Sequence, residues 1–149
     1  MSSEWHPDDS LGDRDNKGEL KGVAAIKAAL RKNKVRLGTG VITSRDPGIA
    51  KVTRDLKRSG LPDRVEQWLL PVIIGPSEGV LYFRSQLKAG AIVPTHSHKH
   101  SVFRIVISGE LKFGRKTLKA GDWMYVPAGV DYAIAAGTPQ PLKIFYMHP

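Results

Sequence analysis

The chain has 149 residues, which is the usual size of one domain and leaves little room for two. It contains no cysteine, so disulfides and thiolate metal sites are excluded, and no segment approaches the roughly 18 apolar residues of a membrane-spanning helix. The first residues lack a basic region followed by an apolar one, so we expect a cytoplasmic protein.

The formal net charge of +9 is unevenly distributed along the sequence. Residues 1–16 carry five acidic side chains and one basic one, whereas residues 17–58 carry 12 Lys and Arg against three Asp and Glu, a net charge of +9. Such an excess could contact phosphates. No recognisable helix-turn-helix accompanies it, so we interpret the charges as solvated helix faces and do not expect a nucleic-acid partner.

The first 64 residues divide into a polar tail and a basic helical arm. Residues 1–16 are rich in Asp and are predicted to form a flexible tail. The arm covers residues 17–64, with a helix predicted over 17–33 and a second, short helix beginning near Pro47. Each helix has one modest apolar stripe, so we expect the arm to pack on the following domain or on a partner subunit.

Residues 65–149 change to short β-rich runs separated by turns rich in Gly and Pro. Many short strands at this spacing predict an all-β antiparallel sandwich or barrel. One of the turns is expected at residues 75–79. The predicted runs cover residues 67–74, 80–87, 91–96, 102–108, 110–114, 116–119, 122–127, 132–136 and 142–147.

Two segments of this β-rich region carry the residues best suited to chemistry, namely residues 90–109 and 121–132. The first contains His96 and His98, which have the same parity and therefore point to one face of an extended strand. Neutral imidazole is the commonest protein ligand for zinc, iron, copper and nickel, and two on one face can bind a single ion.

The spacing of glycines, prolines and histidines in these segments resembles the cupin family, whose motifs are G-x5-HxH-x3/4-E-x6-G and G-x5-PxG-x2-H-x3-N. The resemblance implies a jelly-roll β-barrel that binds one metal ion inside. Two ligand positions differ, because Val102 stands in place of the glutamate and Tyr132 in place of the second-motif histidine. The matching residues are Gly90, His96, His98, Gly109, Gly121, Pro127 and Gly129.

A metal site here needs a third protein ligand besides the two histidines. The resemblance places the Tyr132 hydroxyl toward the ion, and we rank it above His100 and His148. The expected cofactor is one divalent transition metal, with iron ahead of manganese, nickel and zinc. The other interpretation is a pocket that binds no metal.

Arg104 shares the parity of residue 102, so we expect it inside the barrel, where a guanidinium is suited to a carboxylate or phosphate. It either anchors an anionic substrate or pairs with a nearby acidic residue. Tyr82 and Arg84 lie on a polar strand face that is either solvated or lines the pocket, and Trp123 is a core or pocket-wall aromatic. The substrate-binding candidates are therefore Arg104, Tyr82, Arg84 and Trp123.

These residues support three functional hypotheses. The first is a small metal-dependent, dioxygenase-like enzyme that acts on a small anionic organic substrate, with Tyr132 and Arg104 as catalytic candidates; oxygenases occur among the cupins that it resembles. The second is a metal-free isomerase or epimerase in which a histidine and Tyr132 exchange protons. The third is a non-catalytic binding or sensor protein. The resemblance also implies a homodimer.

Overall fold

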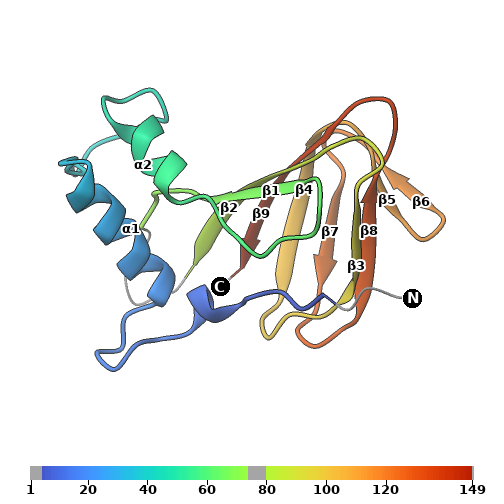
Figure 1. The fold of residues 1–149 in the computed structure, drawn as a ribbon, viewed down its shortest axis with the longest axis horizontal. Coiled ribbons are helices and arrows are strands. Elements are labelled where there is room, and N and C mark those ends of the chain that lie inside the picture. The colour runs from blue at the N-terminus through green and yellow to red at the C-terminus, as the bar shows by residue number, and fades with distance from the viewer. Residues whose placement is uncertain (1–4, 74–79, 149) are drawn as a thin grey trace.

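The computed structural model describes residues 5–73 and 80–148, and the turn expected at 75–79 lies outside these residues. Two antiparallel sheets pack face to face, as Figure 1 shows. All nine predicted runs overlap observed strands, so the predicted antiparallel jelly roll with an N-terminal helical arm is confirmed. One sheet has the order β1 (Val65–Leu69), β2 (Leu81–Leu87), β9 (Leu142–His148), β4 (Val102–Ser108) and β7 (Trp123–Val126), and the other has the order β3 (Ile92–His96), β8 (Tyr132–Ala136), β5 (Leu111–Phe113) and β6 (Lys116–Leu118).

Alternation along β2 and most of β4 decides which of their side chains enter the space between the sheets. In β2 the side chains of Leu81, Phe83, Ser85 and Leu87 are buried, while those between them are partly or fully exposed. The same period in β4 buries Arg104 between two valines. The sequence pattern therefore carries a charged residue into the core region.

The opposite face of the five-stranded sheet is rich in aromatic side chains. Phe145 stacks on Tyr82 with ring centroids 5.7 Å apart, and Phe103 lies 5.7 Å from Trp123. Trp123 and Tyr125 are 62 % and 57 % exposed because they lie on the outer face of the edge strand β7. These aromatic residues thus lie outside the barrel.

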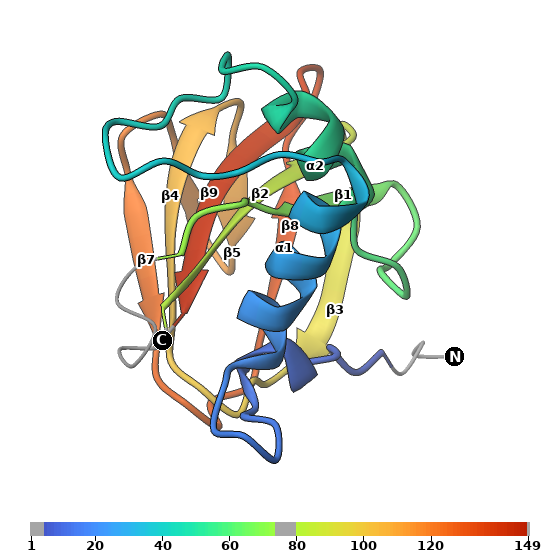
Figure 2. The ribbon, with the colours of Figure 1, turned by 90° about the vertical axis from the view of Figure 1, so that its left-hand side faces the viewer.

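The helical arm consists of α1 (Lys21–Lys32) and α2 (Ile49–Asp55), which lie in front of the β1 and β2 end of the sheet in Figure 2. The first helix begins four residues later than predicted. Asp15 explains the difference, because its carboxylate accepts hydrogen bonds from the amides of Lys17 and Glu19 and holds them in a turn. Among the described residues, no helix has the length and apolar character needed to cross a membrane.

The tail prediction covered residues 1–16, of which the structure describes residues 5–16. Residues 5–13, which we call the N-terminal strap, lie across one end of the barrel and contain the short helix η1 (Ser10–Gly12). Polar contacts hold the strap there. Lys99 Nζ, for example, lies 2.9 Å from the Asp13 carboxylate, and the Lys99 amide donates to Asp9 Oδ2 at 3.0 Å. Two of the acidic residues behind the prediction of a flexible tail, Asp9 and Asp13, therefore bind the barrel.

Candidate functional site

His96 and His98 come together at the end of β3. His96 is the last residue of that strand and pairs with Tyr132, the first residue of β8. His98 follows in the connecting loop. Both imidazoles are buried, with 4 % and 8 % of the residue exposed, and their Nε2 atoms are 3.2 Å apart. The structure thus places the two histidines side by side.

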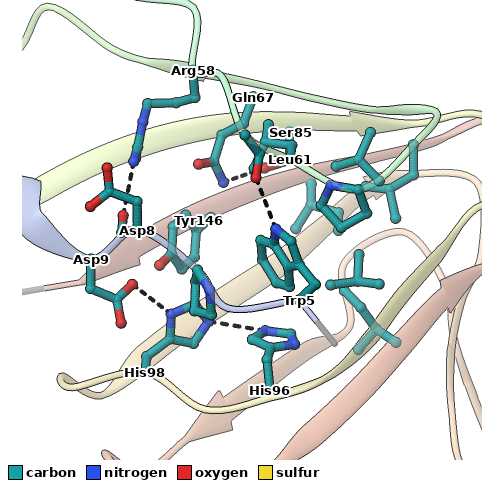
Figure 3. A pocket seen from close by; sticks show the side chains of 18 of the residues that line it. Trp5, Asp8, Asp9, Arg58, Leu61, Gln67, Ser85, His96, His98 and Tyr146 are labelled. Carbon is teal, nitrogen blue, oxygen red and sulfur yellow. Dashed lines mark hydrogen bonds and ion pairs between the residues drawn. The ribbon is translucent and has the colours of Figure 1, made fainter. Parts of the chain in front are cut away.

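The opposite ring nitrogens fix the orientation of both histidines. His96 Nδ1 lies 2.6 Å from the Pro94 carbonyl, and His98 Nδ1 lies 2.9 Å from Asp9 Oδ1 (Figure 3). Because carbonyl and carboxylate oxygens only accept, each Nδ1 carries a hydrogen. Burial lowers the pKa of His96 to about 4, so this ring is neutral at pH 7 and its Nε2 carries a bare lone pair.

Tyr132 and Arg104 complete the polar cluster. The Tyr132 hydroxyl lies 3.1 Å from His98 Nε2 and accepts a hydrogen bond of 2.7 Å from Arg104 Nη2. The guanidinium also lies over the Tyr146 ring, 4.4 Å from its centroid. Arg104 is buried, and within residues 5–73 and 80–148 it makes no salt bridge and its Nε atom has no hydrogen-bond partner. A buried cation without a carboxylate is suited to an anionic ligand.

The donor set fits a metal ion bound by His96, His98 and Tyr132. Two imidazole nitrogens at about 2.0–2.1 Å from one zinc ion in a tetrahedral site lie roughly 3.3 Å apart, close to the observed 3.2 Å. With both rings neutral, the Tyr132 hydroxyl donates to His98 Nε2 at 3.1 Å, and a cation shared by the three side chains would replace that hydrogen. No group of three or more His, Cys, Asp or Glu side chains among the described residues is arranged to hold an ion, so the third ligand would be the tyrosine.

A cavity of about 50 Å³ opens beside the histidines, under the strap. Asp9 and Trp5 of the strap form one wall, and the Trp5 ring packs edge-on against His96 with centroids 4.8 Å apart. Figure 3 shows both strap residues directed toward the two histidines. The opposite walls come from the barrel and from the loop after α2, and include Arg58, Gln67, Ser85, Arg104 and Tyr146.

The other candidates lie elsewhere. Tyr82, Arg84 and Trp123 occupy the outer face of the five-stranded sheet, because their parity is opposite to that of the inward residues. His100 lies in a crevice with Asp9 and Val102, and the structure does not bring it into a metal-binding group with the two histidines. The His148 side chain is outside the described part of the chain.

Sequence reasoning did not find Asp9 or Trp5. Asp9 stands 89 positions before His98, in a segment without a motif or periodicity. Its only signal is its place in the acidic stretch of residues 1–16, and net charge does not specify a partner. Both strap residues reach the site only through tertiary contacts between segments that are far apart in the sequence.

A jelly roll of two antiparallel sheets with paired histidines inside defines a class of small β-barrel proteins. The model of the cupin domain matches residues 83–148, which contain both histidines, Arg104 and Tyr132. Residues 83–148 therefore match a cupin domain, as the resemblance of the two motifs implied. No curated protein matches the sequence.

Three solved structures illustrate the similarity. The polyketide cyclase RemF from Streptomyces resistomycificus is 17 % identical over 60 % of this chain and 68 % of its own, with a TM-score of 0.50. A structure of Rhodobacter sphaeroides SigE in complex with the anti-sigma ChrR matches 87 % of this chain and 78 % of its own, with 15 % identity and a TM-score of 0.54. The cupin domain of an XRE family transcriptional regulator from Enterobacter cloacae is 17 % identical over 58 % and 96 %, with a TM-score of 0.50. At these identities the likeness shows the fold alone.

Proposed function

We propose that this cupin is a metal-dependent, dioxygenase-like enzyme that acts on a small anionic organic substrate inside the barrel. One observation carries the proposal: the Nε2 atoms of His96 and His98 converge at 3.2 Å while both Nδ1 atoms are occupied by acceptors. Second acceptors of this kind orient metal-binding histidines and raise their basicity. The arrangement supports a divalent transition metal, with iron first among the candidates.

In this proposal the residues of the site have different roles. His96, His98 and the Tyr132 hydroxyl would hold the ion, and Asp9 keeps the lone pair of His98 directed toward it. Arg104 lines the same cavity and would bind the anionic group of the substrate. A bound divalent ion supplies Lewis-acid chemistry and, in the case of iron, electron transfer to oxygen. Burial of the cluster excludes bulk water from these groups.

Elemental analysis of untagged protein tests the proposal. Wild-type protein is expected to contain about one equivalent of iron, manganese, nickel or zinc, and a His96→Ala/His98→Ala variant prepared identically is expected to contain almost none, because a tyrosine alone does not retain the ion. His6→Ala, which removes an exposed imidazole of the strap, serves as the control and should keep the wild-type content. Wild-type protein that is metal-free and binds no added ion would contradict the proposal.

The second candidate is a metal-free isomerase or epimerase, favoured by the hydrogen-bond chain Asp9–His98–Tyr132–Arg104. In this alternative the Asp9 carboxylate stabilises a protonated His98, and Tyr132 or a histidine exchanges a proton with the substrate. The same metal analysis separates the two candidates. A metal-free wild type that exchanges solvent deuterium into a bound substrate would favour proton transfer, and saturable binding with no change of the ligand would favour the binding or sensor protein.

The homodimer stays a prediction, which sedimentation velocity checks. We expect a species of twice the 16.4 kDa chain mass at micromolar concentration. A single species at the mass of one chain over the same concentration range would refute the dimer.

A further inference from the structure

The N-terminal strap covers the candidate site and contributes to it. Asp9 Oδ1 binds His98 Nδ1 at 2.9 Å, and the Trp5 ring packs on His96 at 4.8 Å between centroids. Each of the two histidines is therefore contacted by a different residue of the strap. The histidines lie more than 80 positions after the strap in the sequence.

With the strap in place, the cavity has no room for an organic substrate. Its volume is about 50 Å³, against the roughly 300–1,000 Å³ of ordinary ligand pockets. Space for one or two water molecules remains. The strap lines the cavity together with residues 58–62 of the loop after α2, so a substrate that reaches His96 and Arg104 would have to displace one of these two segments.

Polar contacts hold the strap at several points, and its Trp5 and Leu11 side chains pack against the core cluster. Trp5 Nε1 donates to the Gly60 carbonyl at 2.9 Å, and Arg58 Nη2 donates to the Asp8 carbonyl at 2.9 Å. Asp13 binds Lys99 at the barrel surface, where both side chains are substantially exposed. Segments near a chain terminus open at less than the global unfolding free energy. No strap residue belongs to either sheet, so release of the strap would leave the strand pairing intact.

We propose that the N-terminal strap is a lid whose closure completes the site, with Asp9 as the positioning residue of His98. The proposal rests on the metal-dependent function above. With the strap closed, Asp9 keeps the hydrogen of His98 on Nδ1 and its Nε2 lone pair toward His96, while Trp5 excludes water from the His96 side. With the strap lifted, the cavity is open to an anionic substrate and His98 loses its carboxylate. Coupling of closure to site assembly is a known means of protecting a reaction from water.

Co²⁺ titration of the full-length chain, followed by visible absorption, tests the role of Asp9. Asp9→Asn is expected to bind Co²⁺ about 10- to 100-fold more weakly than the wild type, the usual effect of removing an outer partner of a metal-binding histidine. Asp13→Asn is the matched control, since it makes the same change in the same strap but binds Lys99 instead, and its affinity should stay within about twofold. Asp9→Glu should restore part of the affinity.

Trp5→Ala tests the lid. Removing the ring that packs on His96 should increase the rate at which excess chelator removes Co²⁺ by about three- to tenfold, because an aromatic contact of ordinary strength no longer favours the closed strap. Trp123→Ala removes an exposed indole on the outer face and should leave the rate unchanged. Equal release rates in both variants would overturn the lid, and equal Co²⁺ affinities of Asp9→Asn and Asp13→Asn would overturn the positioning role.

Nitrogen NMR of the imidazoles separates failure of this inference from failure of the metal proposal. If wild-type protein binds no Co²⁺, the metal proposal fails, and the ¹⁵N shifts of His98 in the metal-free proteins then decide the role of Asp9. The Nδ1-protonated form should dominate in the wild type and in Asp13→Asn and should be depleted in Asp9→Asn. Identical His98 shifts in all three proteins would overturn the inference without reference to a metal.

Discussion

Gly109→Ala is expected to lose about 2–5 kcal/mol of unfolding free energy, a large part of the stability of a domain this size. Gly109 has φ +79°, a conformation that costs an L-residue about 1–2 kcal/mol. A Cβ there would also overlap the Pro141 carbonyl oxygen and lie 2.9 Å from Leu142 Cα. Both neighbours are backbone and cannot turn away, which adds about 1–3 kcal/mol of overpacking. Urea unfolding measures the loss.

Gly114→Ala is the matched control for this prediction. Gly114 also has positive φ, +57°, but nothing lies within 4 Å of a Cβ built there. Its loss should be limited to the conformational cost of about 1–2 kcal/mol. If the two alanine variants unfold at the same urea concentration, close approach to residues 141 and 142 is not the reason for a glycine at this motif position.

Arg104→Met is expected to weaken the binding of a small carboxylate probe, oxalate, by about 10- to 100-fold while leaving the unfolding free energy unchanged or higher. A hydrogen bond to a charged group contributes about 1.5–3 kcal/mol, which gives the fold-change. The stability should not fall, because the guanidinium is buried without a carboxylate partner among the described residues, and replacing such a charge by an apolar chain is often neutral or stabilising. Calorimetric titration and urea unfolding provide the two readouts.

Arg84→Met provides the control for Arg104→Met. Arg84 lies over the Trp68 ring at 4.7 Å on the outer face, so this change removes an equal charge outside the barrel and should not alter oxalate binding. Intact oxalate binding in Arg104→Met, together with a loss of 3–5 kcal/mol of stability, would instead assign Arg104 a structural role.

Local sequence patterns were sufficient to predict the strands, because a strand is specified by the alternation of residues that are close in the sequence. Alternation over seven residues of β4 predicts both that Arg104 points inward and that its neighbours point outward. Helix starts are harder, since the capping-box spacing at Asn16 competes with the turn that the Asp15 carboxylate forms. The start of the helix then depends on which of two side-chain hydrogen-bond patterns of similar strength forms, and the sequence does not show which one is stronger.

The candidate site was only half accessible to sequence reasoning. His96 and His98 were predicted to share one face of an extended strand, but β3 ends at His96 after an irregular register, and His98 reaches the site from the loop. Tyr132 follows from family spacing. The contribution of Asp9 depends on how the strap crosses the barrel end, which no local pattern encodes. Tyr82 and Trp123 were predicted to bind substrate but lie on the outer face of the sheet. Alternation separates the two faces of a sheet but does not show which face lines the pocket.

The contact between Asp9 and His98 also sets an order of events during folding. It joins residues 89 positions apart, and closing such a long loop lowers the entropy of the chain before the contact can stabilise the fold. The strap is synthesised before any strand of the barrel, whereas His98, the partner of Asp9, follows β3. We therefore expect the Asp9–His98 contact to form late in folding, although Asp9 is the first residue of this pair to leave the ribosome.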